Sequence, residues 1–353
     1  MTQVKTKAGR YPPPKRSASP TVPTPAHLDP ARLPPTALLV AAMLAAATGA
    51  LALATRAPLA TTVLGLIAFG VLHNVLEIRY VAGRFGRLLT GRFLALLLAL
   101  ITGIVLCRVA ASVWPGPARV SEVVLGFAIL AAGCRIGLRG RWLVLAWSVL
   151  AVAGAAAVTM PAYYFVILTH LHNLVPLVFL WEWAGRLPVL RERWAFRATQ
   201  LLWIVVLPLL ILAGAVDGWI GPAPGVVERF VGDGGRVIAA AAPPEAMAQW
   251  GLRFLVMFAF MQTMHYVVWV AFLPRFAPEA IAAFDARVPW LRGRRAWLFG
   301  LAAGAGVAVL FWSDYFQGRA LYAALASYHA YLEFPVLLAL LVAPLGVIRL
   351  TAK

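Results

Sequence analysis

The chain has 353 residues, of which 62% are hydrophobic and only 12% are charged. Soluble globular proteins carry about 25% charged residues, so this composition excludes a soluble enzyme, a secreted disulfide scaffold and a disordered chain. The formal net charge of +18 would indicate nucleic-acid binding in a soluble protein. Here the basic residues lie in short gaps between long apolar segments, where they set orientation and contact anionic lipids. We therefore expect a polytopic membrane protein with no nucleic-acid partner.

The first 35 residues differ from the rest of the chain. They combine basic residues between Lys5 and Arg16 with repeated prolines from Pro12 to Pro25. Such a segment favours a solvated, polyproline-like conformation and lacks the apolar stretch of a cleavable signal. We expect residues 1–35 to be a disordered, Pro-rich basic tail and residues 36–353 to form a single transmembrane helical domain.

Ten apolar segments follow, and each is long enough to cross a hydrocarbon core of about 30 Å as a helix. They cover residues 36–55, 58–79, 92–113, 120–138, 142–160, 162–184, 199–220, 252–274, 296–313 and 320–348. No segment has the alternation typical of β-strands, so the predicted fold is an all-α membrane bundle. The longest connection, residues 221–251, contains several prolines and has room for one short surface helix.

The charges of the connections predict the orientation. Arginines concentrate in alternate connections, at residues 84–92, 135–141, 186–197 and 275–295. The intervening connections hold few arginines, and several of these stand beside acidic residues. Because positively charged connections stay on the cytoplasmic side, this alternation predicts that both termini are cytoplasmic. We expect the protein in the inner (plasma) membrane of a bacterium.

Five of the six histidines lie inside predicted spans, where ionisable side chains are costly and typical of functional sites. They are His73, His170, His172, His265 and His329. All five lie in even-numbered spans, which run in the same direction. His73, His172 and His265 lie at depths in the middle to cytoplasmic half of the membrane, and so does His329 if the tenth helix bends at Pro335. We therefore expect one histidine from each of four spans to bind a shared metal or haem. The alternative is that each forms a separate interhelical hydrogen bond.

His170 and His172 compete for one ligand position. Residues two apart point about 200° from each other on a helix, so only one of them faces a given centre. We prefer His172, with His170 as the alternate, because Asn173 and Pro176 follow it and a locally opened helix would expose polar backbone there. The predicted ligands are therefore His73, His172, His265 and His329.

Two of the histidines have an acidic partner four residues later. Glu77 follows His73 and Glu333 follows His329, a spacing that places each carboxylate on the face of its histidine, one turn away. We expect Glu77 and Glu333 to orient the first and last ligands and to offset the charge of a divalent cation. Alternatively, both could bind a carboxylate-bridged metal pair directly.

Imidazole ligands suit iron, copper, zinc and nickel. Non-haem iron(II) beside an apolar channel fits oxidation of a lipid-soluble substrate, and aromatic residues near the histidines could line that channel. These aromatic residues are Tyr163, Tyr164, Tyr266, Trp269, Tyr328 and Tyr331. One alternative is a bis-histidine haem b electron carrier or quinol oxidoreductase. Another is a proton-coupled transporter with a His/Glu relay.

The order of these motifs resembles the Brp/Blh family of membrane β-carotene 15,15′-dioxygenases. "GVLHNVLE", from Gly70 to Glu77, is similar to the family's Gly-x-x-His-x-x-x-Asp element, "FAFMQTMHYVVW" to its Phe-rich run before a histidine, and "SYHAYLEF" to its late His with a nearby acid. "THLHN" stands where the family has its second intramembrane histidine. The family's Phe-rich run is followed by a His-x-x-x-His element, and here Trp269 replaces the second histidine of that element. The resemblance implies packed transmembrane helices around histidine-bound iron, dioxygenase activity and a carotenoid-like polyene substrate.

Two further charged residues lie near the outer ends of adjacent predicted spans. Arg108 belongs to the third span and Glu122 to the fourth. We expect either an ion pair between them or side chains that extend toward the membrane surface.

Overall fold

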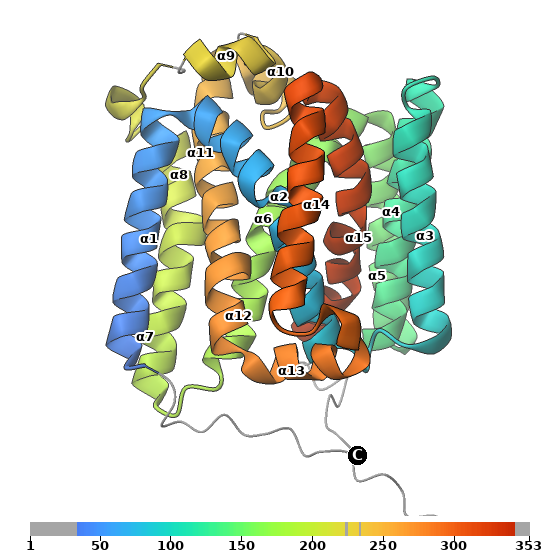
Figure 1. Cartoon of the computed structure of the whole chain (residues 1–353). Coiled ribbons are helices and arrows are strands. Elements are labelled where there is room, and N and C mark those ends of the chain that lie inside the picture. Colours follow the sequence, from blue (N-terminus) through green and yellow to red (C-terminus); the bar gives the residue numbers. More distant parts are fainter. Residues whose placement is uncertain (1–33, 223–224, 233, 343–353) are drawn as a thin grey trace, which may run out of the picture.

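The computed structural model describes residues 34–222, 225–232 and 234–342, which contain helices and turns but no β-strand. Ten helical segments in this part of the chain are long and apolar enough to cross a membrane, as predicted, and the protein is an all-α, polytopic membrane bundle (Figure 1). Most of the predicted tail (residues 1–33) and the end of the predicted tenth span (343–348) lie outside the described residues.

The ten crossings follow one another with short connections. Eight are single α-helices: α1 (Thr36–Arg56), α2 (Pro58–Arg84), α3 (Gly91–Ala110), α4 (Pro115–Gly137), α5 (Gly140–Thr159), α6 (Pro161–Ala184), α14 (Arg294–Ser313) and α15 (Tyr315–Val342). Two contain a π-helical turn: α7 (Leu190–Leu201), Leu202–Val206 and α8 (Leu207–Leu212); and α11 (Met247–Tyr266), Val267–Phe272 and α12 (Leu273–Phe276).

Both π-helical turns end just before a proline, Pro208 or Pro274. Proline lacks a backbone N–H, and its ring clashes with the carbonyl four residues earlier in an α-helix. A wider i→i+5 turn accommodates the ring, and such turns are frequent at functional sites. The second one begins directly after His265 and Tyr266, so the backbone widens beside a predicted ligand.

The helix that carries His172 does not open as predicted. α6 remains α-helical from Pro161 to Ala184, across Pro176. α15 likewise remains helical across Pro335. Neighbouring helices pack against both segments and keep the chain helical despite the hydrogen bond that each proline removes.

Short helices cover the two ends of the bundle. α9 (Gly225–Val231) and α10 (Gly235–Ile238) lie over one end, here called the capped end, where one surface helix was predicted (Figure 1). α13 (Pro278–Arg287), which was not predicted, lies across the opposite end, here called the basic end. The seventh crossing also differs, because its helix begins at Leu190 rather than near residue 199. Arginine and glutamate favour helix, so the charged segment after Val189 is helical too.

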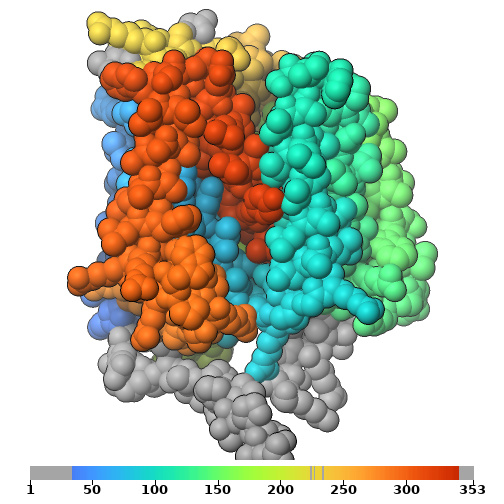
Figure 2. Space-filling model, turned by 45° about the vertical axis from the view of Figure 1, so that its right-hand side comes forward, coloured from blue at the N-terminus to red at the C-terminus, as the bar shows by residue number. Residues whose placement is uncertain are grey.

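Three of the four histidine-bearing helices form the centre of the bundle. In the most apolar stretch of each crossing, 67% of residues are buried for α11, 61% for α15 and 44% for α2, against none for α5. Figure 2 shows one face of the molecule hollowed between α14 and α3, with α15 and α2 visible at its floor. The helices that carry the candidate site are therefore held by packing on several sides.

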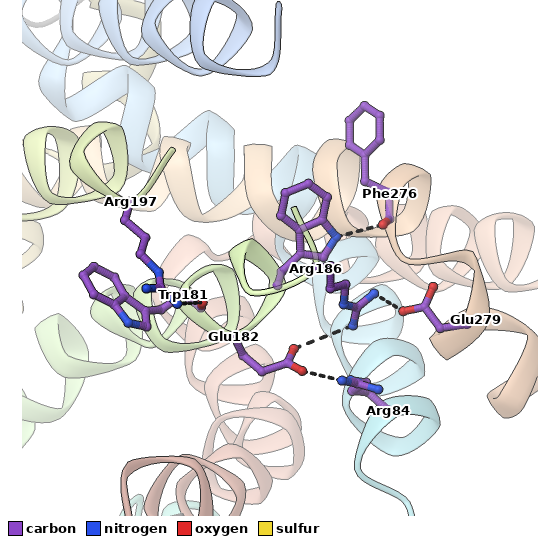
Figure 3. A network of polar contacts seen from close by, with 8 residues as sticks. Arg84, Trp181, Glu182, Arg186, Arg197, Phe276 and Glu279 are labelled. Atoms are coloured by element: carbon purple, nitrogen blue, oxygen red, sulfur yellow. Dashed lines mark hydrogen bonds and ion pairs between the residues drawn. The ribbon is translucent and has the colours of Figure 1, made fainter. Parts of the chain in front are cut away.

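A network of ion pairs fixes helix ends at the basic end (Figure 3). Glu182 of α6 pairs with Arg84 of α2, and Arg186 pairs with both Glu182 and Glu279 of α13. The Trp183 indole donates to the Phe276 carbonyl oxygen at 2.8 Å. These contacts join α2 and α6, which carry two of the candidate ligands, to α12 and α13.

Replacing Gly83 with alanine is expected to destabilise this arrangement. A Cβ atom at Gly83 would lie 2.0 Å from the Ala280 backbone oxygen, so α13 would have to move away from α2. Overpacking of this kind costs about 1–3 kcal/mol. Thermal and denaturant unfolding in detergent should show a lower stability for Gly83→Ala. Gly49→Ala is the control, because a Cβ there meets nothing within 4 Å, and it should be neutral or slightly stabilising.

Candidate metal centre

Four helices bring one histidine each to a single point inside the bundle. His73 comes from α2, His172 from α6, His265 from α11 and His329 from α15. Neighbouring ring centroids are 5.1 Å apart for His73–His265, 4.5 Å for His265–His172, 4.9 Å for His172–His329 and 5.0 Å for His329–His73. Residues far apart in the sequence therefore form one compact cluster, as expected from their depths.

One nitrogen–nitrogen distance in the cluster, at which the two rings can also hydrogen-bond to each other, is compatible with ligands on one ion. The Nε2 atoms of His172 and His329 are 3.2 Å apart. Two nitrogens bound to the same ion at about 2.0–2.1 Å with a near-tetrahedral angle lie about 3.3 Å apart. His73 donates from Nδ1–H to the Phe69 carbonyl oxygen at 3.0 Å, which leaves its Nε2 for the centre.

The two predicted carboxylates lie in the cluster but support other histidines than expected. Glu77 Oε2 is 3.5 Å from Nε2 of His265, and Glu333 Oε2 is 3.5 Å from Nδ1 of His172. The sequence prediction had paired each acid with the histidine of its own helix. Each carboxylate lies one turn away from the histidine of its own helix, and at that depth it meets the histidine of a neighbouring helix. Each acid therefore links two helices.

By distance, Glu77 is a closer candidate ligand than His265. One ligand atom each from His73, Glu77, His172 and His329 lies within 4.8 Å of all the others. His265 contacts two of these rings but does not belong to that group. By these distances a His₃-Glu set fits one ion better than the predicted four histidines, with His265 beside Glu77.

The cluster leaves many buried polar atoms without a hydrogen-bond partner. Among the described residues these atoms include both carboxylate oxygens of Glu77 and of Glu333, both ring nitrogens of His265, and Nδ1 of His172 and of His329. Buried polar groups without a partner cost about 1–3 kcal/mol each, and more when charged. Both glutamates have fully buried side chains and, within the described chain, pair with histidine only. This donor set, in which no described lysine or arginine pairs with either carboxylate, fits a bound cation.

His170 lies outside the cluster. Its Nε2 is 2.7 Å from the Ala241 carbonyl oxygen, beyond α10, and its ring packs against Phe254 and Phe258. Its role in the structure is to hold the connection at the capped end against α6. Of the two competing residues, the structure therefore brings His172 to the centre.

A cavity of about 190 Å³ adjoins the histidines. Of the aromatic residues predicted to line a channel, Tyr266 and Tyr331 do so, and the Tyr266 ring is 4.8 Å from that of His73. Sequence reasoning did not single out Gln262 and Tyr322, which also line it. Their spacing in the sequence could have indicated this. Gln262 is three residues before His265 and Tyr322 is seven residues before His329, so each shares a helix face with its histidine.

A second, larger groove of about 530 Å³ lies between α2, α1 and α11. It is lined almost entirely by apolar side chains, among them Leu53, Leu64 and Phe69, each more than 40% exposed. Tyr266 lines both the groove and the cavity, so it stands between the lipid-facing surface and the histidines.

No protein-family model, no curated protein and no solved structure matches this chain. The resemblance to the Brp/Blh family therefore rests on the short motifs alone. The feature that bears on function is the His/Glu cluster, which could hold a metal ion inside a membrane bundle.

Proposed function

We propose that this protein is a membrane-embedded, non-haem iron oxygenase that acts on a lipid-soluble polyene. The observation that carries the proposal is the cluster of buried imidazole and carboxylate atoms that lack hydrogen-bond partners around one point. Neutral histidines with two carboxylates supply the charge that a divalent cation needs. Iron(II) in a site of histidine and carboxylate ligands supplies the redox chemistry by which dioxygen is activated.

The geometry favours a single ion over haem. The rings of His73 and His172 are 6.5 Å apart, close to the roughly 6.4 Å between two imidazoles on opposite sides of one iron. The rings of His265 and His329, however, are each within 5.1 Å of both. They occupy the plane that a porphyrin would have to fill.

The lipid-soluble substrate is supported by the groove and its relation to the centre. The groove is apolar and faces the bilayer side of α1, α2 and α11, and it meets the cavity at Tyr266. A hydrocarbon chain moving in from the membrane would remain among apolar side chains until it passed this ring. This route supports a long apolar substrate rather than a small polar one.

The chain's own residues would hold and orient the reactants. His73, His172 and His329 with Glu77 would bind the ion, Glu333 would orient His172, and the surrounding apolar helices would exclude water. Cleavage of one carbon–carbon double bond by one dioxygen molecule gives two carbonyl groups, each with one of its oxygen atoms. This reaction consumes no electrons from a donor.

The first test is the visible absorption spectrum of the detergent-purified protein, with elemental analysis of the same sample. We expect about one iron per chain and no Soret band. Incubation with a conjugated polyene should then consume dioxygen and yield carbonyl products, and the His329→Ala variant should do neither. The matched control is His170→Ala, whose ring lies outside the cluster.

Other results would contradict the proposal in distinct ways. A Soret band with stoichiometric iron would make the protein a haem electron carrier. Zinc or copper in place of iron would exclude the iron oxygenase. A protein without bound metal after anaerobic preparation would favour a transporter with a His/Glu relay.

A further inference from the structure

An ion pair between a half-buried arginine and a buried glutamate contributes to the wall of the histidine cavity. Arg108 of α3 donates from Nε and Nη2 to the same Glu122 oxygen of α4, at 2.8 and 2.6 Å, and from Nη1 to the Ala323 carbonyl oxygen of α15. Tyr331 donates to that Glu122 oxygen at 3.5 Å and lies 3.1 Å from the Tyr164 hydroxyl. Both Arg108 and Tyr331 line the cavity together with the four histidines of the cluster.

The guanidinium retains hydrogen-bonding capacity. Arginine has five N–H donors, and the bonds to described residues use three of them. Placing this pair inside a membrane protein is costly, and an ion pair needed only to join helices is no more stabilising than apolar packing. Its position on the cavity wall gives it a second use, because a polar group entering the cavity would meet donors that are already held in place.

Arg108 and Tyr266 both line the cavity and belong to helices on different sides of the centre of the bundle. α3 and α11 lie on the two sides of the central helices α2 and α15 (Figure 1). A molecule that entered past Tyr266 would thus have the histidines along its length and Arg108 at its leading end. The pair with Glu122 is neutral overall, so a neutral oxygen suits this position better than a carboxylate, which would compete with Glu122.

We propose that Arg108, with Glu122 and Tyr331, forms a binding site for the hydroxyl or carbonyl end of an amphiphilic substrate whose hydrocarbon chain lies toward Tyr266 and the apolar groove. This inference rests on the proposed function, since it assigns the substrate class and its orientation at the same centre. If the site acts in this way, the affinity for the ligand depends on one of its oxygen atoms. The bond that reacts then lies at a constant distance from that oxygen along the chain.

The test compares two ligands that differ in this atom only. Parinaryl alcohol and the hydrocarbon with a methyl group in place of its CH₂OH end are titrated anaerobically into the purified protein, with energy transfer from tryptophan to the tetraene as the signal. A hydrogen bond to a charged group predicts that the alcohol binds about 10- to 100-fold more tightly. Parinaric acid should bind more weakly than the alcohol.

Paired variants identify the residues responsible. Arg108→Met with Glu122→Gln removes both charges together, and it should abolish the preference for the alcohol while leaving hydrocarbon affinity within about two-fold. The control is Arg79→Met with Asp285→Asn, a second Arg–carboxylate pair between helices, which is bidentate, lies outside the cavity lining and should keep the preference. Arg108→Lys, which retains the charge but not the planar donor arrangement, gives a second variant if the first does not fold.

Equal affinities for alcohol and hydrocarbon, a stronger binding of the acid, or no saturable binding at all would overturn the inference. A preference that survives the Arg108 variants would do so as well. Binding is measured without turnover, whereas the iron content of the same sample reports on the proposed function. Bound iron without a preference for the alcohol would therefore reject only the oxygen-binding site at Arg108. A preference for the alcohol in a protein without iron would reject only the proposed oxygenase function.

Discussion

The His329→Ala, His73→Ala and His172→Ala variants are each expected to lose their bound metal. Each of these rings belongs to the group of ligand atoms that lie within 4.8 Å of one another. Structural zinc sites with four protein ligands bind with about 10–16 kcal/mol, and on that scale losing one ligand costs roughly 3 kcal/mol, a hundred-fold or more in affinity. Elemental analysis after dialysis against a chelator measures the loss.

Two further histidines make this experiment selective. His170→Ala should retain the full metal content, because its ring bonds to the Ala241 carbonyl oxygen instead. His265→Ala should retain metal at reduced affinity. The His265 ring lies 3.5 Å from the Glu77 carboxylate and is not one of the four residues whose ligand atoms lie within 4.8 Å of one another. Complete loss in His265→Ala would place this residue among the ligands, as the sequence alone predicts. Full retention in any of the first three variants would remove that residue from the site.

The two carboxylates are expected to differ in their effect on metal affinity. Glu77→Gln replaces a carboxylate whose oxygen lies within the group of candidate ligand atoms, and it should weaken binding by more than about a hundred-fold. Glu333→Gln changes a residue that contacts His172 at 3.5 Å, and loss of such a supporting partner costs about 10- to 100-fold. Competition titration with a chromophoric chelator gives both values.

Glu279→Gln is the control for removing a carboxylate. Glu279 pairs with Arg186 at the basic end, in the network that joins helix ends, and its loss should leave metal affinity unchanged. Equal effects of Glu77→Gln and Glu333→Gln would contradict the distinction between them. An effect of Glu333→Gln larger than that of Glu77→Gln would make Glu333 the ligand.

The sequence was sufficient for the crossings because each depends on local composition. A stretch such as residues 36–55 must be helical in lipid whatever it packs against, since every backbone group needs an internal partner. The predicted helix boundaries were wrong where charged residues within a helix resemble those of a connection. The charged segment from Leu190 was assigned to a connection, although its residues favour helix, and α13 was missed for the same reason. Which end faces the cytoplasm remains a prediction from the arginines in the connections.

The sequence also indicated the members of the site, because histidines are rare and costly in apolar helices. It did not determine their pairing. The i, i+4 spacing of His73 and Glu77 fixes a shared face, but only the packing of α2 against α11 decides that Glu77 meets His265. Likewise, Arg108 and Glu122 could be recognised as a pair, whereas their place on the wall of the histidine cavity depends on α15. Periodicity fixes which side of a helix a residue occupies, and the rotation and depth of that helix follow only from contacts between helices distant in the chain.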